Sequence, residues 1–227
     1  MKKAVLLLVM GLFILGSTGP AFAEEAEVIK LPAPQMDGGM PLMKALKLRR
    51  STRGNYGPDT PLSMQTISNL LWAADGVNRP PNKRTAPSAV DWQNIDIYVT
   101  TADGLFLYDA QKHELKVLGK KDVRGVAGSQ DFVAGAPLNL IYVADFNRAK
   151  GFGGQGDTMP TAETWSFAGT GTIAQNVYLF CASEGLACIV RAMADPVAIA
   201  KTLNLRPDQK FMLAQTVAHF KEGATPK

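Results

Sequence analysis

Three short apolar segments in the middle of this chain constrain its fold most strongly. Residues 95–99 alternate between apolar and polar side chains, and residues 105–108 follow the pair Asp103-Gly104, which is a strong hairpin turn signal. Residues 115–118 form the third segment. Turns this short join neighbouring strands that run in opposite directions. The sequence therefore predicts an antiparallel meander.

Helical periodicity occurs on both sides of the meander. Residues 40–50 carry one apolar face, and residues 63–75 carry another that begins with a serine in a favourable N-cap position. Residues 161–184 form the longest helical pattern, and Gly185 stands where a helix commonly ends. These patterns predict three helices of unequal length.

The remaining apolar runs are typical of further strands. Residues 137–144 are rich in Leu, Ile and Val, and residues 186–190 and 211–220 are also strand-like. Asp195 and Pro196 between the last two runs favour the start of a short helix. This order predicts an α+β fold in which helices pack on a mainly antiparallel sheet.

Residues 1–23 have the form of a secretory signal peptide. Two lysines precede an apolar run over residues 4–15, and an Ala-Phe-Ala pattern ends at Ala23. No later apolar stretch reaches the roughly 20 residues that a membrane-spanning helix needs. We therefore expect export to the periplasm or the exterior without a stable membrane span. Residues 24–39 are expected to form an extended N-terminal arm, and residues 40–227 a single domain.

Charge and residue spacing argue against two classes of function. The formal net charge is only +4, and no nucleic-acid-binding motif is present. The histidines, His113 and His219, and the cysteines, Cys181 and Cys188, lack the spacing of metal ligands. Nucleic acid and metal sites are therefore not expected, and His113, in a predicted turn, is expected to face solvent.

Cys181 and Cys188 leave two alternatives open. Export would permit a disulfide between them. However, Cys181 falls on a helical pattern and Cys188 on the strand-like segment that follows. We favour two buried free thiols.

The densest group of hydrogen-bond donors in the chain consists of Arg49, Arg50, Ser51, Thr52 and Arg53. A guanidinium donates in a planar fork that suits phosphate, and a hydroxyl beside it can donate or accept. This group therefore suits the anionic end of a ligand. The alternative is a solvated basic helix end, because helix C-termini favour cations.

Two long connections are candidates for a functional role. Residues 77–89 form a polar, proline-rich loop that carries Arg79, Lys83 and Arg84. Residues 147–160 are rich in glycine, and we expect a mobile loop beside a ligand. Loops of this length inside a compact domain are commonly functional.

In their order and separation, four segments resemble the nitroreductase-like flavoprotein family, near the branch of the thiazoline and thiazole dehydrogenases. They are the Arg-rich residues 49–53, Ala-Pro-Ser-Ala at 86–89, Ala-Gln-Asn at 174–176, and Ser-Glu-Gly-Leu-Ala at 183–187. The resemblance extends over roughly residues 38–221. It implies the nitroreductase-like fold and an intertwined homodimer that binds FMN at its interface.

The resemblance also implies which residues hold the cofactor. Arg49, Arg50, Ser51 and Arg53 would surround the FMN phosphate, the ribityl chain and the pyrimidine edge, and Lys221 would add a contact to the phosphate. A dianionic phosphate suits forked donors, and an anionic reduced flavin is stabilised by a nearby cation.

The flavin ring is expected to contact other segments. The resemblance places Pro87 and Ser88 of the partner subunit close to the ring, and it places the backbone N–H of Ala192 near flavin N5. No side chain is expected to act as a catalytic acid or base, because the flavin performs the chemistry.

The function expected from the resemblance is that of an exported FMN-dependent oxidoreductase, which transfers hydride between the flavin and a small conjugated acceptor or donor. Because NAD(P)H is scarce outside the cytoplasm, a different electron donor is expected, such as a partner protein or a reduced small molecule. The first alternative is a non-catalytic protein on the same fold that binds a ligand or a partner. The second is an exported domain whose arginines contact anionic polymers.

Overall fold

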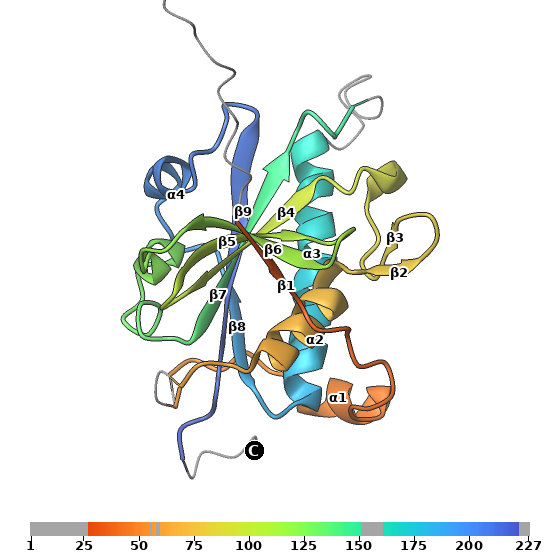
Figure 1. The fold of residues 1–227 in the computed structure, drawn as a ribbon, viewed down its shortest axis with the longest axis vertical. Helices are drawn as coiled ribbons and strands as arrows, with labels where there is room; N and C mark the ends of the chain where they lie inside the picture. Colours follow the sequence, from red (N-terminus) through yellow and green to blue (C-terminus); the bar gives the residue numbers. More distant parts are fainter. Residues whose placement is uncertain (1–26, 55, 58–59, 151–160, 223–227) are drawn as a thin grey trace, which may run out of the picture.

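The computed structural model describes residues 27–54, 56–57, 60–150 and 161–222 (Figure 1). The expected signal peptide, residues 1–23, lies outside these described residues, as do residues 151–160 of the expected glycine-rich loop.

A seven-stranded sheet forms the centre of the fold, and every pairing in it is antiparallel. The strand order is β1-β6-β5-β4-β7-β9-β8. The strands are β1 (Val28–Lys30), β4 (Ile95–Thr101), β5 (Gly104–Asp109), β6 (Glu114–Gly119), β7 (Leu138–Asp145), β8 (Ala187–Arg191) and β9 (Gln209–Ala218). The predicted meander is confirmed as β4, β5 and β6.

The predicted helices are present, and side chains cap three of their N-termini. The helices are α1 (Leu42–Leu48), α2 (Met64–Asp75), α3 (Ala162–Ser183) and α4 (Pro196–Thr202). Ser63, Thr161 and Asp195 accept backbone N–H groups at the starts of α2, α3 and α4. Gly185 adopts a φ of 68° just after α3, a conformation that glycine adopts without strain.

Helices cover both faces of the sheet. In Figure 1, α3 runs along one face together with α1 and α2, whereas α4 lies on the opposite side. The short 3₁₀ helix η2 (Arg124–Ala127) packs on the side of α4. The chain therefore builds three layers, with α3 as the longest element of one outer layer.

Each face of the sheet has its own hydrophobic core. Along β7, Leu140 and Tyr142 belong to the cluster that includes α2 and α3. Ile141 and Val143 belong to the cluster that includes α4. Successive side chains of a strand point to opposite faces, so this unbroken apolar run serves both cores.

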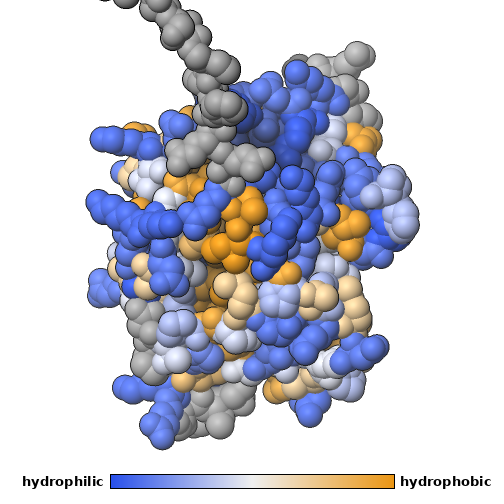
Figure 2. Space-filling view, viewed as in Figure 1, coloured by the Kyte–Doolittle hydropathy of each residue, from blue (hydrophilic) through white to orange (hydrophobic). Residues whose placement is uncertain are grey.

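The N-terminal arm lies against its own chain over the residues described. Its residues 28–30 form β1, which pairs with β6 at the edge of the sheet. Ser68 on α2 donates to the carbonyl of Pro32 at 2.6 Å. Figure 2 shows hydrophobic side chains gathered in the middle of the face that β1 crosses, surrounded by hydrophilic ones.

Two expectations about the loops need correction. Residues 77–89 contain a small hairpin of β2 (Val77–Arg79) and β3 (Lys83–Arg84), followed by the 3₁₀ helix η1 (Ala89–Asp91). His113 is half-buried rather than solvent-facing. Its Nε2 lies 2.7 Å from Ser68 Oγ, and its Nδ1 lies 3.0 Å from the hydroxyl of Tyr108.

Candidate active site

The Arg-rich residues 49–53 leave the end of α1 and run beside β8, the edge strand of the sheet. The backbone N–H of Thr52 donates to the carbonyl of Cys188 at 2.9 Å. This bond covers part of an otherwise open sheet edge. Residues far apart in the sequence are thereby held at one place.

Tyr178 on α3 joins the Arg-rich segment to β8. Its hydroxyl accepts the N–H of Val190 at 2.8 Å and lies 2.7 Å from Ser51 Oγ. The guanidinium of Arg49 lies over the ring of Tyr178, at 5.2 Å from the ring centroid. This distance suits a cation–π contact, which fixes Arg49 without neutralising its charge.

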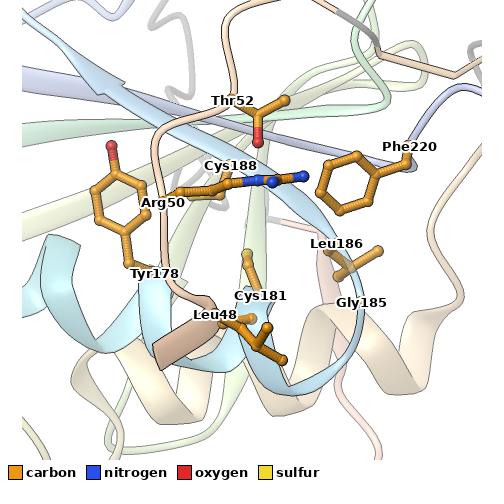
Figure 3. A pocket seen from close by; sticks show the side chains of 10 residues that line it. Leu48, Arg50, Thr52, Tyr178, Cys181, Gly185, Leu186, Cys188 and Phe220 are labelled. Atoms are coloured by element: carbon orange, nitrogen blue, oxygen red, sulfur yellow. The ribbon is translucent and has the colours of Figure 1, made fainter. Parts of the chain in front are cut away.

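Arg50 extends across a pocket between α3, β8 and the end of β9. Figure 3 shows its guanidinium pointing toward the ring of Phe220, and the distance to the ring centroid is 5.5 Å. Thr52, Cys181 and Cys188 line the same pocket. The Thr52 Oγ1 atom is buried and has no hydrogen-bond partner among the described residues.

Several positively charged side chains gather at this place. Arg49, Arg50 and Arg53 come from one segment, and Lys221 directly follows Phe220, on which Arg50 stacks. Among the residues that the structure describes, no carboxylate lies within ion-pair distance of Arg49, Arg53 or Lys221. The arrangement therefore suits an anionic group.

Arg191, at the end of β8, is a buried cation that the sequence analysis did not single out. Its guanidinium donates to Asn139 Oδ1 at 3.0 Å and to the carbonyl of Ala127 at 3.1 Å. Burial lowers the pKa of Arg191 to about 10, and the nearby Tyr56 and Cys188 oppose that effect. The exposed residue Ala192 directly follows this anchored side chain. In the sequence, Arg191 stands at the end of a strand-like run and belongs to no recognisable motif.

Pro87 and Ser88 lie elsewhere, beside the N-terminal half of α3. Thr172 Oγ1 is 3.3 Å from the carbonyl of Pro87, and Ser88 Oγ accepts the N–H of Gln93 at 3.0 Å. Thr172 and Tyr178 are six residues apart on α3, or about 9 Å at the rise of an α-helix. One chain alone does not place Pro87 and Ser88 against residues 49–53.

Small or polar side chains line one exposed side of α3 over residues 168–175. Ala168, Gly171 and Gln175 are exposed and lie three or four residues apart, so they share one side of the helix. Small side chains allow the backbone of a neighbouring element to approach closely.

Cys181 and Cys188 are both buried and free, as predicted. Burial raises the pKa of the Cys181 thiol well above its ordinary value, and the neighbouring Cys188 adds to this effect. A protonated, buried thiol is a weak nucleophile. Cys181 therefore does not have the character of a reactive group in this state.

Comparisons with known proteins define the class. The sequence profile of the Nitroreductase family matches residues 46–219. A protein of Methanocaldococcus jannaschii named "Putative nitroreductase" is 31% identical over 152 residues, which cover 62% of this chain and 73% of that protein. This chain belongs to the nitroreductase family.

Solved structures agree with this assignment. The crystal structure of a "putative nitroreductase" from Ralstonia eutropha JMP134 is 41% identical, with a TM-score of 0.76 over 85% of this chain and 89% of that one. A second, from Desulfovibrio desulfuricans, was crystallised in complex with FMN. It shares the fold at 18% identity, with a TM-score of 0.54 over 81% of this chain and 88% of that one.

The described residues contain neither a membrane-spanning helix nor a metal-binding cluster. No helix there is long and apolar enough to cross a membrane. Within the same residues, no group of three or more His, Cys, Asp or Glu side chains is placed to hold a metal ion.

Proposed function

We propose that this protein is an FMN-dependent oxidoreductase that transfers hydride between the flavin and a small conjugated acceptor or donor. Membership of the nitroreductase family supports a flavin oxidoreductase. The observation that carries the proposal is the anchored group of cations at residues 49–53, beside β8 and Phe220.

The residues present fit the anionic end of FMN. Arg49, Arg50, Arg53 and Lys221 supply the positive charge, and Ser51 is held at the same place by Tyr178. The buried hydroxyl of Thr52 lacks a partner among the described residues and is a further donor or acceptor. When bound, FMN supplies the hydride transfer, and these residues hold and orient it.

We further propose that two copies of the chain complete each site. Pro87 and Ser88 would cover the flavin from the partner subunit, and the backbone N–H of Ala192 would face flavin N5. The resemblance to the family supports this assignment. Within one chain, Pro87 contacts Thr172 and Ser51 contacts Tyr178. The exposed side of α3 at Gly171 and Gln175 offers a surface for the second copy.

Export is part of the same proposal and rests on residues 1–23 of the sequence. In the periplasm or outside the cell, the electrons would come from a partner protein or a reduced small molecule. Expression of the full chain followed by fractionation tests this. Recovery of a shortened protein in the exported fraction supports export, and full-length protein in the cytoplasm contradicts it.

A double variant tests the cation group directly. Arg49→Ala with Arg53→Ala is expected to weaken FMN binding at least 100-fold, because each lost charge-assisted hydrogen bond is worth roughly 1.5–3 kcal/mol. Lys44→Ala with Lys47→Ala removes the same charge from the adjacent helix α1 and serves as the control. If both double variants weaken FMN binding equally, Arg49 and Arg53 act only through their net charge and not through specific hydrogen bonds to the cofactor.

A further inference from the structure

Asp75 forms part of a wall between two cavities. The first cavity has a volume of about 10 Å³ and lies against Pro87 and Ser88. The second has a volume of about 240 Å³, and charged side chains line much of it. Asp75, Arg84 and Ile95 line both cavities, which places Asp75 between them.

The second cavity connects Asp75 to solvent. Lys116 and Arg148 line it, and their side chains are 39% and 38% exposed. The first cavity has room for a single water molecule, because a water needs about 10–15 Å³ of accessible space. Its lining is mainly apolar, and Asp75, Ser88 and Gln93 are among the polar residues that line it.

The carboxyl group of Asp75 is buried and only loosely paired. Its side chain is 12% exposed, and the nearest guanidinium nitrogen of Arg84 lies 3.9 Å away, which is beyond hydrogen-bond distance. Arg84 instead donates to the main-chain carbonyl of Asp75 at 3.0 Å and to Gln93 Oε1 at 3.1 Å. Arg84 is thus fixed by other bonds and does not lock the carboxylate in its charged form.

The surroundings of Asp75 allow both protonation states at neutral pH. Burial raises the pKa of Asp75 to about 7, Arg84 and then Arg148 oppose this, and Asp96 on β4 adds to it. Tyr108 on β5 faces the same group. Burial raises the pKa of the Tyr108 phenol, and the charge of Asp75 raises it further. Asp109 and Lys116 line the charged cavity farther out and pair with each other at 2.9 Å.

We propose that Asp75 is the proton-transfer group that links solvent in the charged cavity to the small cavity at Pro87 and Ser88. A proton passes from hydronium in the charged cavity to the Asp75 carboxylate. The neutral carboxyl then gives a proton to a water in the small cavity as that water gives one of its own protons to the reduced acceptor, and the carboxylate returns beside Arg84. One proton enters and one leaves, and no electrons move.

This inference rests on the proposed function, because reduction of a quinone or nitro group by hydride also consumes a proton. In that role Asp75 would replace the proton that each reduced acceptor takes up at the Pro87–Ser88 side of the site. Buried carboxyls in clefts with a raised pKa are frequent at functional sites, and structural ion pairs are the competing explanation. The test must therefore measure proton exchange as well as activity.

The experiment compares the wild type with Asp75→Asn and Asp75→Glu in the dimer loaded with FMN. Asp109→Asn, which alters the same charged cavity without touching the wall, is the matched control. FMN affinity is measured first by fluorescence, and turnover with a quinone is then followed between pH 5.5 and 8.5. In parallel, carbon NMR of the aspartate carboxyl groups follows Asp75 in the FMN-free protein.

The proposal predicts a carboxyl signal that titrates near pH 7 and is absent from Asp75→Asn. That variant should bind FMN as tightly as the wild type, turn over at least tenfold more slowly at pH 7, and lose the pH dependence near 7. Asp75→Glu should recover at least part of the rate and the pH dependence, and Asp109→Asn should behave as the wild type.

Two results would overturn the proposal. One is an Asp75→Asn variant with unchanged turnover and pH profile. The other is an Asp75 signal that titrates below pH 5, in its ordinary range. Failure of the wild type to bind FMN would instead contradict the proposed function, and the NMR titration would still show whether Asp75 exchanges protons at neutral pH.

Discussion

The hydroxyl of Tyr178 lies 2.7 Å from Ser51 Oγ, although 127 residues separate the two in the chain. The same hydroxyl accepts the N–H of Val190 on β8. One side chain of α3 therefore fixes both the Arg-rich segment and the strand beside it. The candidate site is a product of tertiary packing around the end of this helix.

Removal of that hydroxyl should loosen the site. Tyr178→Phe leaves the Val190 N–H without its partner, which should cost about 1–3 kcal/mol of stability and weaken FMN binding several-fold. Fluorescence titration with FMN and thermal unfolding measure the two effects. Tyr108→Phe on β5 is the control, because it removes a buried hydroxyl that lies 3.0 Å from His113 Nδ1, and three strands separate β5 from β8. A loss of FMN affinity that is equal in both variants would contradict this role of Tyr178.

Two glycines of the meander should respond differently to alanine. At Gly104, φ is +146° and a Cβ atom would lie 2.1 Å from the carbonyl oxygen of Gly119. Gly104→Ala should therefore lower the free energy of unfolding by about 2 kcal/mol or more, or roughly 4–8 °C in the melting temperature. A Cβ at Gly119 meets nothing within 4 Å, so Gly119→Ala is the matched control. Similar melting temperatures for the two variants would show that the hairpin tolerates the added methyl group.

The free energy of unfolding should depend on pH through the titration of Asp75. Its pKa is raised from 3.8 to about 7 in the folded protein, chiefly by burial. A raised folded-state pKa contributes stability that is complete below about pH 4 and is lost as the pH rises through 7, by roughly 4 kcal/mol at most. Asp75→Asn should remove this loss, so the variant gains stability relative to the wild type between pH 4 and 8.

Asp109→Asn is the control for that titration. Burial raises the pKa of Asp109, but hydrogen bonds from Lys116 and from the amides of Lys112 and Gln111 outweigh it, so its pKa lies below the usual range. Its stabilising effect is present at neutral pH and is lost on acidification. Chemical unfolding at each pH measures both variants. Parallel stability curves for the wild type and Asp75→Asn from pH 4 to 8 would contradict the burial argument.

Ser68 should hold the N-terminal arm in place. Its buried hydroxyl donates to the Pro32 carbonyl and lies within hydrogen-bond distance of His113 Nε2. Ser68→Ala should cost about 1–3 kcal/mol and should speed hydrogen exchange at the Leu31 amide, which bonds the His113 carbonyl. Unchanged exchange at Leu31 would show that the pairing of β1 with β6 is sufficient to hold the arm.

Much of the fold could be predicted because its signals are local. Capping by Ser63 and Asp195, the Asp103-Gly104 turn and the apolar run of β7 depend on neighbouring residues only. The pairing of β1 with β6 depends on a distant strand, and the three residues Val28–Lys30 carry no pattern of their own. Short segments that pair non-locally therefore escaped prediction.

The candidate site could be predicted in part for the same reason. The Arg-rich residues 49–53 form a recognisable cluster in the sequence, and the structure places them together beside β8. Arg191 and Asp75 were not singled out, because burial and distant partners such as Asn139 and Arg84 give these residues their character. Such partners become visible only after folding.

The visible absorption spectrum of the purified mature protein, recorded before and after gel filtration with added FMN, tests the central claim most directly. We predict flavin absorption bands that stay with the protein at the size of a dimer, and their loss in the Arg49→Ala, Arg53→Ala double variant. A colourless protein that elutes without FMN at micromolar concentrations of the cofactor would contradict the account. The Arg-rich segment would then bind an anion other than FMN on the nitroreductase fold.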